Sequence, residues 1–168
     1  MTRFTRDELE QLIEERRARG GLELYLKEAD LSGLDLSGLD LRNAYLRRAN
    51  LHSTDLHEAN LSGADLMEAN LSLADLRNAD LYQANLTGAD ASGANFTFAH
   101  LAQADCTAAI LREANLTFAD ARRANFTLAD FSRANLREAK LNGAVLDNAD
   151  LTDARLQGAI MPNGARHE

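Results

Sequence analysis

Residues 59–71 read ANLSGADLMEANL, and the pattern in this stretch decides the fold. Each repeat has Ala, then Asp or Asn, then Leu, then two variable residues, and the repeats run without a break from Ala29 to Met161. If the Leu is taken as the centre, a centre falls on every fifth residue from Leu31 to Met161, which makes 27 repeats. Ala stands two residues before the centre in 24 of them, so an internal repeat governs the architecture.

A period of five residues fits neither a straight α-helix nor a flat β-strand. On a helix, five residues turn by about 500°, so successive Leu side chains step around the axis and form no apolar stripe. On a strand, side chains five residues apart lie on opposite faces, so half of the Leu residues face water. The conflict disappears if the chain bends once per repeat. The Ala and the Leu then point inward, the Asp or Asn between them points outward, and the two variable residues form a corner.

The glycines agree with a corner in each repeat. Asp and Asn tolerate tight backbone geometry and can hydrogen-bond the nearby backbone, and Gly supplies further conformational freedom. Seven glycines fall on the second variable position: Gly33, Gly38, Gly63, Gly88, Gly93, Gly143 and Gly158.

This motif resembles that of the pentapeptide repeat family, and the resemblance covers 133 of the 168 residues. It implies an all-β fold, a right-handed quadrilateral β-solenoid with four repeats in each coil and therefore about seven coils. The ending Met161-Pro162-Asn163-Gly164 resembles those of cyanobacterial members.

The centres predict a filled core with no central pore. Small centres are followed by large ones, as at Ala91 and Phe96, which keeps the packed volume nearly constant. We interpret Cys106, which occupies a centre, as a small buried hydrophobe. The core positions that we single out are Leu61, Leu66, Leu71, Leu76, Phe96, Cys106, Phe126 and Phe131.

The first 28 residues do not follow the repeat, and they predict a short helix at about residues 5–19 that covers the first coil. Thr5 and Glu8 form a capping box, Phe4 and Leu9 its hydrophobic staple, and Gly20-Gly21 stops the helix. The apolar stripe consists of Leu9, Leu12 and Ile13. We therefore divide the chain into a capping helix with its lead-in (1–28), the β-solenoid (29–163) and a C-terminal tail (164–168).

The C-terminal end has no second predicted helix. The tail either folds back or leaves a strand edge that can meet a copy of the chain, so we hypothesise a homodimer through the C-terminal coil. A single Cys excludes an internal disulfide and suits a reducing compartment, and no apolar run is long enough for a membrane helix. We expect a cytoplasmic protein without contact to membranes.

No catalytic, cofactor-binding or metal-binding pattern occurs in the sequence, so we predict a protein that is not an enzyme and has no cofactor. His52 and His57 lack a convincing third ligand, and we interpret them as exposed polar residues. The many Asp residues are a consequence of the repeat. A solenoid with a filled core also lacks the concave pocket that most enzymes need.

Two surface functions remain open. The first is binding of a protein partner, because Phe98 and Phe118 occupy outward corner positions 20 residues apart and should stack on one face, flanked by Thr97 and Thr117. The alternative reading of this pair is that stacked Phe side chains only cover the coil surface.

The second function is mimicry of DNA, since some members of the resembled family inhibit or protect DNA gyrase through a rod with DNA-like charge. The net charge is −8, and the four faces sum to −4, −2, +1 and −2 from the face with centres 31–151 onward. Arginines interrupt the negative field, which is far from the density of duplex DNA, one charge per about 1.7 Å. The acidic balance also argues against direct nucleic-acid binding.

Overall fold

Each five-residue repeat consists of one short extended piece and one turn. In the first turn the carbonyl of Leu26 accepts a hydrogen bond from the Ala29 N–H at 3.1 Å, and Glu28 between them has φ of 58°. A positive φ at the third residue of a turn is the pattern of a type II β-turn. The same turn recurs at every repeat up to Gly158, so the bend predicted from the five-residue period is confirmed.

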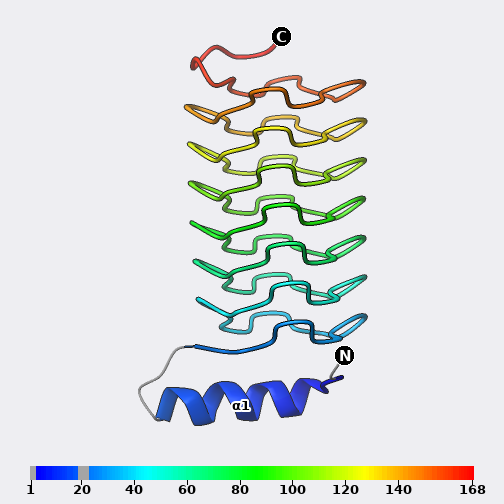
Figure 1. The fold of residues 1–168 in the computed structure, drawn as a ribbon. Coiled ribbons are helices and arrows are strands. Elements are labelled where there is room, and N and C mark those ends of the chain that lie inside the picture. The colour runs from blue at the N-terminus through cyan, green and yellow to red at the C-terminus, as the bar shows by residue number, and fades with distance from the viewer. Residues whose placement is uncertain (1–2, 19–22) are drawn as a thin grey trace.

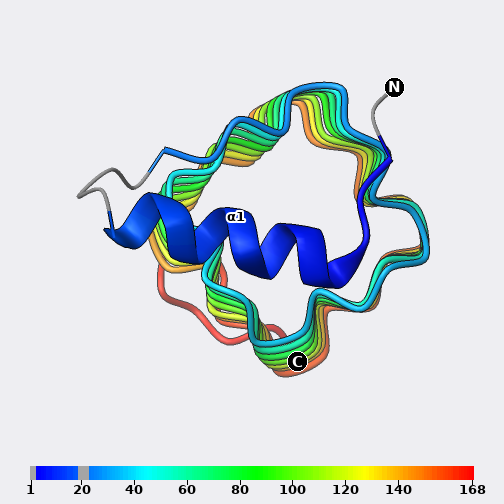
Figure 2. The same ribbon diagram turned by 90° about the horizontal axis from the view of Figure 1, so that it is seen from below.

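The computed structural model, which describes residues 3–18 and 23–168, stacks these repeats into a right-handed quadrilateral β-helix (Figures 1 and 2). Each residue before a centre from Asp30 to Lys140 forms a parallel β-bridge with the residue twenty positions later, as Asp30 does with Asn50 and Asn50 with Asn70. Within the described ranges the extended pieces are single-residue bridges, not longer strands. Four repeats therefore complete one coil, and residues twenty apart lie in columns along the rod.

The interior is filled by the centres and by the Ala residues that precede them. Phe126 and Phe131 meet edge to face, with ring centroids 4.9 Å apart. Thr54 replaces an inward Ala and is also buried, and its hydroxyl donates to the Leu31 carbonyl at 2.8 Å, so its polar atom is satisfied. The core positions singled out from the sequence are at most 1% exposed: Leu61, Leu66, Leu71, Leu76, Phe96, Cys106, Phe126 and Phe131.

Helix α1 (Arg6–Ala18) lies across the N-terminal end of the solenoid (Figure 2). The capping box is present: the Thr5 N–H donates to Glu8 Oε2 at 2.7 Å, and the Glu8 N–H donates to the Thr5 hydroxyl at 3.3 Å. Leu9 and Ile13 are buried in the core cluster, and Phe4 and Leu12 pack against it. The helix thus covers apolar centres that the first coil otherwise leaves exposed. The expected stop at Gly20-Gly21 lies outside the described residues.

The solenoid begins one repeat before the expected boundary at residue 29. Tyr25 forms a parallel bridge with Tyr45, and Leu24 and Leu26 are buried inward residues. The sequence boundary was too late because Leu and Tyr stand in this repeat where the pattern has Ala and Asp or Asn. Residue types alone therefore do not identify this repeat, although its side chains alternate between inward and outward in the same way as in the other repeats.

The C-terminal tail folds back onto the last coil, at the end of the rod opposite α1 (Figure 1). Ile160 and Arg166 form an antiparallel bridge, and the His167 N–H donates to the Ala159 carbonyl at 2.8 Å. The tail protects only one side of the last coil, because Leu151 and Leu156 remain half-buried.

Candidate protein-binding surface

The corner of each repeat determines which side chains can meet a partner. The second variable residue has a positive φ at all repeats from Glu28 to Gly158, and twenty of these residues are not glycine. Most of their side chains are exposed. The residue before each centre supports the turn: the Asn95 side-chain oxygen, for example, accepts a hydrogen bond from the Thr97 N–H at 3.1 Å. Because the backbone on both sides of the turn is hydrogen-bonded, a large side chain at this position is attached to a rigid backbone.

Phe98 and Phe118 form a stacked pair on such a column of corners, and we call this pair the Phe ladder. Their ring centroids are 4.9 Å apart and the ring planes differ by 6°. The rings remain 58% and 46% exposed, so stacking covers only part of each. Two adjacent exposed aromatic rings on a rigid backbone form a ready contact surface, because little conformational entropy is lost when a partner binds.

The threonines beside the ladder are engaged within the solenoid. The Thr97 hydroxyl donates to Asn95 Oδ1 at 2.6 Å and accepts from Asn115 Nδ2 at 2.9 Å. The Thr117 hydroxyl donates to Asn115 Oδ1 at 2.6 Å. These contacts link the two neighbouring coils directly before the corners that carry the ladder. The apolar rings, more than the hydroxyls, are therefore free for contact with a partner.

A second aromatic pair was missed in the sequence. Tyr25 and Tyr45 stack with centroids 4.7 Å apart, and the Arg16 guanidinium lies 5.4 Å from the Tyr25 ring centroid. The Tyr25 hydroxyl donates to the Glu23 carboxylate at 2.6 Å, and this bond raises the pKa of Tyr25. The 20-residue spacing of the two tyrosines is the sequence signal for this pair, but the repeat that contains Tyr25 departs from the Ala-Asp/Asn-Leu pattern, so the spacing is hard to recognise. This pair joins α1 to the first coil.

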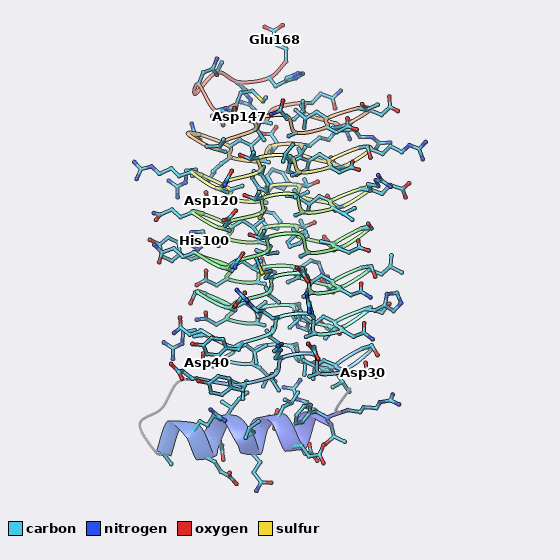
Figure 3. The ribbon with its side chains drawn as sticks, viewed as in Figure 1. Asp30, Asp40, His100, Asp120, Asp147 and Glu168 are labelled. Carbon is cyan, nitrogen blue, oxygen red and sulfur yellow. The ribbon has the colours of Figure 1, made fainter. Side chains whose placement is uncertain are left out.

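The face that follows the Phe ladder along the chain contains a notch of about 600 Å³. Its floor is Ala102, a corner residue that is only 7% exposed, between the longer side chains of Tyr82 and Arg122. His100 lies beside it, one layer below Asp120 on the same side of the rod (Figure 3). No sequence motif marks this notch, since it results from one short residue in a column of long ones.

His52 and His57 hydrogen-bond neighbouring side chains, and Cys106 is buried. His57 Nδ1 donates to Asp55 at 2.7 Å, and this bond raises the pKa of His57. His52 hydrogen-bonds Ser72. Burial raises the pKa of the Cys106 thiol far above its usual range, so the reactive thiolate is disfavoured. In this part of the chain no group of three His, Cys, Asp or Glu residues is arranged to hold a metal ion.

A comparison with protein-family models matches the pentapeptide repeats over residues 25–63, 54–90, 92–127 and 129–163. The chain belongs to the pentapeptide repeat family. The match begins at residue 25, in agreement with the early start of the solenoid in the structure. A search of curated proteins gave no significant match.

Solved pentapeptide repeat structures include two similar cyanobacterial proteins. HetL, involved in heterocyst differentiation regulation in Nostoc sp. strain PCC 7120, is 30% identical, with 92% of this chain and 98% of HetL covered and a TM-score of 0.46. Rfr23 from Cyanothece 51142 is 26% identical, with 72% and 86% covered and a TM-score of 0.50.

A third similar structure comes from a resistance protein. QnrB1, a plasmid-mediated fluoroquinolone resistance protein, is 18% identical, with 79% and 80% covered and a TM-score of 0.55. This level of similarity concerns the fold alone. Within the described residues of the present chain, no helix is long and apolar enough to cross a membrane.

Proposed function

We propose that this pentapeptide repeat protein is a non-enzymatic interaction protein that presents a rigid solenoid surface to a protein partner. The observation that carries the proposal is the Phe ladder, whose two rings are stacked, held by a bonded backbone and yet about half exposed. Exposed aromatic side chains are enriched at protein interfaces. Cross-strand packing alone accounts for the covered faces of Phe98 and Phe118 but not for the choice of large apolar residues at solvent-facing corners.

The test is affinity capture from native lysate with the wild type and a Phe98→Glu, Phe118→Glu double variant. The variant should fold, because Glu58 and Glu138 occupy the same column of corners with the same positive φ. We expect a partner that the wild type retains and the variant loses.

A matched control removes two exposed apolar side chains elsewhere. Leu73 and Leu128 occupy corner positions on two other columns and are 61% and 59% exposed. A Leu73→Glu, Leu128→Glu double variant changes the net charge by the same amount and should retain the partner. An identical set of captured proteins for the wild type and the Phe double variant contradicts the proposal.

A DNA-mimic that binds DNA gyrase is the alternative function, and the net charge of −8 is the observation in its favour. The structure weakens it because cations lie among the acidic side chains. Arg47 contacts the Asp65 carboxylate at 2.6 Å, and Arg112 contacts that of Asp130 at 2.5 Å. We expect no inhibition of gyrase supercoiling at about 10 μM protein, a concentration at which micromolar binding is well occupied. Inhibition would favour the alternative.

We also propose that the chain self-associates through its C-terminal coil. The half-buried Leu146, Leu151 and Leu156 support this, because their side chains belong to the core but are not fully covered. Their N–H groups have no backbone acceptor among the described residues. A second copy placed end to end can cover both the apolar and the hydrogen-bonding groups.

A further inference from the structure

The notch next to the Phe ladder has the chemistry of a site for a negatively charged group. We name it the arginine notch and define it by Tyr82, His100, Ala102, Arg122 and Arg123. The short Ala102 side chain leaves room between Tyr82, one coil before it, and Arg122, one coil after it. The His100 ring stacks on that of Tyr82, with centroids 5.6 Å apart and planes 16° apart, which makes one wall flat and rigid.

The two arginines of the notch differ in their existing partners. Arg122 Nε and Nη2 donate to the two carboxylate oxygens of Asp120 at 2.8 and 2.6 Å, so its charge is engaged. Within the part of the chain that the structure describes, the Arg123 guanidinium has no ion pair. Its side-chain stem passes over Gly143, where an added Cβ would lie 3.4 Å from Arg123 Cγ. Arg123 therefore supplies an unneutralised positive charge that can bind an anion.

The electrostatics of this face differ from those of the molecule as a whole. The net charge of the chain is −8, yet the face with centres 41–161 is the one that sums to +1. Around the notch, Arg122, Arg123 and Lys140 outnumber Asp80 and Asp120. An acidic ligand is repelled least here, and a basic ligand is favoured on the other faces.

The arginine notch and the Phe ladder lie at the two edges of one face. His100 follows Phe98 by two residues, and Asp120 follows Phe118 by two. Arg123 follows Phe118 by five residues, so the two side chains start no more than about 17 Å apart along the backbone. One short extended segment can contact both places, because it advances about 3.3 Å per residue.

We propose that the arginine notch binds an aspartate or glutamate carboxylate of a partner protein segment whose apolar side chain packs on the Phe ladder. The inference rests on the proposed protein-binding function and adds the chemistry of the partner. The recognised segment is extended and acidic, with its apolar and acidic side chains separated by about three to five residues. Arg123 binds the carboxylate, and the Tyr82–His100 wall limits its approach from one side.

The test uses NMR spectra of the isotope-labelled chain during titration with a defined peptide, Ser-Gly-Leu-Ser-Gly-Glu-Glu-Gly-Ser. At about 1 mM peptide, the weak end of specific recognition, we expect shifts of the Gln103 and Arg123 amides and of the Phe98 and Phe118 ring signals. A peptide with Lys in place of Glu should lose the shifts at the notch. A peptide with Ser in place of Leu should lose those at the ladder.

Two variants of the protein distinguish binding of the carboxylate by Arg123 from a general effect of the net charge. Arg123→Glu keeps a residue type that the chain accepts at this corner geometry, as at Glu113, and should weaken binding of the acidic peptide by about tenfold. Arg133→Glu is the control, since Arg133 is a corner residue of another column, contacts Glu113 at 3.5 Å and makes the same change in net charge. Equal weakening by both variants overturns the proposal.

The remaining outcomes distinguish failure of the acidic-partner proposal from failure of the protein-binding function. Shifts at the ladder without shifts at the notch support the protein-binding function and overturn the acidic partner. Shifts at the notch alone, unchanged when Leu is replaced, support an anion site but contradict a partner that spans both places. No shift at either place overturns the inference. A short poly(dT) strand that gives stronger shifts than the acidic peptide assigns the site to nucleic acid instead.

Discussion

At the scale of the residue, the second variable position of each repeat combines a strained backbone conformation with an exposed side chain. Twenty residues other than glycine adopt φ between 54° and 62° there, a conformation that costs an L-residue about 1–2 kcal/mol. The cost is tolerated because backbone hydrogen bonds on both sides of each corner hold the turn. The side chain at such a corner points into solvent from a fixed backbone, as the rings of Phe98 and Phe118 do.

This strain can be measured by exchanging Ala and Gly at corners. Ala108 is exposed with φ of 54°, so Ala108→Gly removes strain but adds freedom to the unfolded chain, and we expect a net stabilisation of about 0.5–1 kcal/mol. Gly33 has φ of 67° and no atom within 4 Å of an added Cβ, so Gly33→Ala should destabilise by about 1 kcal/mol through the backbone alone. Denaturant unfolding measures both, and changes of the same sign would contradict the argument.

The acidic residues before the centres predict the response to pH. Hydrogen bonds from the Ser32 hydroxyl lower the pKa of Asp30, and those from the Thr152 hydroxyl lower the pKa of Asp150. A carboxyl whose pKa is lowered by folding stabilises the fold above its unfolded pKa, and this stability is lost as the pH falls toward the folded pKa. We expect stability to decline between about pH 5 and pH 3.

An Asp30→Asn, Asp150→Asn double variant tests the cause. Asn keeps the acceptor oxygen, and the Asn125–Thr127 pair already makes the same two bonds at 3.1 and 2.6 Å. The variant should therefore lose less stability than the wild type over the same pH range. Parallel stability curves for the two proteins would show that other groups control the acid sensitivity.

At the scale of the element, α1 closes an end that the repeats cannot close themselves. Leu9 is fully buried against the first coil, so Leu9→Ala should destabilise this end by about 2–4 kcal/mol. Because coils contact mainly their neighbours, hydrogen exchange should increase most near Leu26 and Leu31 and least near Leu136. Gln11→Ala, on the exposed side of the helix, is the control. Equal loss of protection along the whole rod would contradict a local role for α1.

The elements could be predicted to different extents from the sequence. The bend in each repeat, the inward centres and the capping box followed from spacing, because each depends on residues a few positions apart. The start of the solenoid did not, because Leu24 and Tyr25 preserve the alternation but not the residue types of the repeat. The fold-back of the tail onto Ala159 rests on backbone hydrogen bonds, which leave no pattern in side chains.

The candidate surface was predictable only in part, for a similar reason. The stacking of Phe98 on Phe118 follows from a period of 20 residues and two large side chains. The arginine notch depends on Ala102 being shorter than its neighbours twenty residues before and after it. A small residue at a variable position looks unremarkable until the coils are stacked, so the notch became visible only in three dimensions.

At the scale of the whole molecule, the rod has two unlike ends, and this asymmetry predicts its assembly. Helix α1 covers the first coil, whereas the last coil leaves Leu146, Leu151 and Leu156 half-buried (Figure 1). If two copies pair through their C-terminal ends, only the ends covered by α1 face outward. No further copy can then add to the pair, so the assembly is closed. A dimer, not a filament, is therefore the expected product of self-association.

Light scattering of the 168-residue chain tests this assembly. We expect a mass that doubles with concentration up to about 50 μM, in the range of a micromolar dissociation constant. Leu151→Glu places a charge at the open end, where desolvation on pairing is costly, so this variant should remain a monomer. Leu73→Glu, on the side of the rod, should still dimerise. A monomeric mass for the wild type over this range contradicts end-to-end pairing, and higher oligomers would show that the covered end also associates.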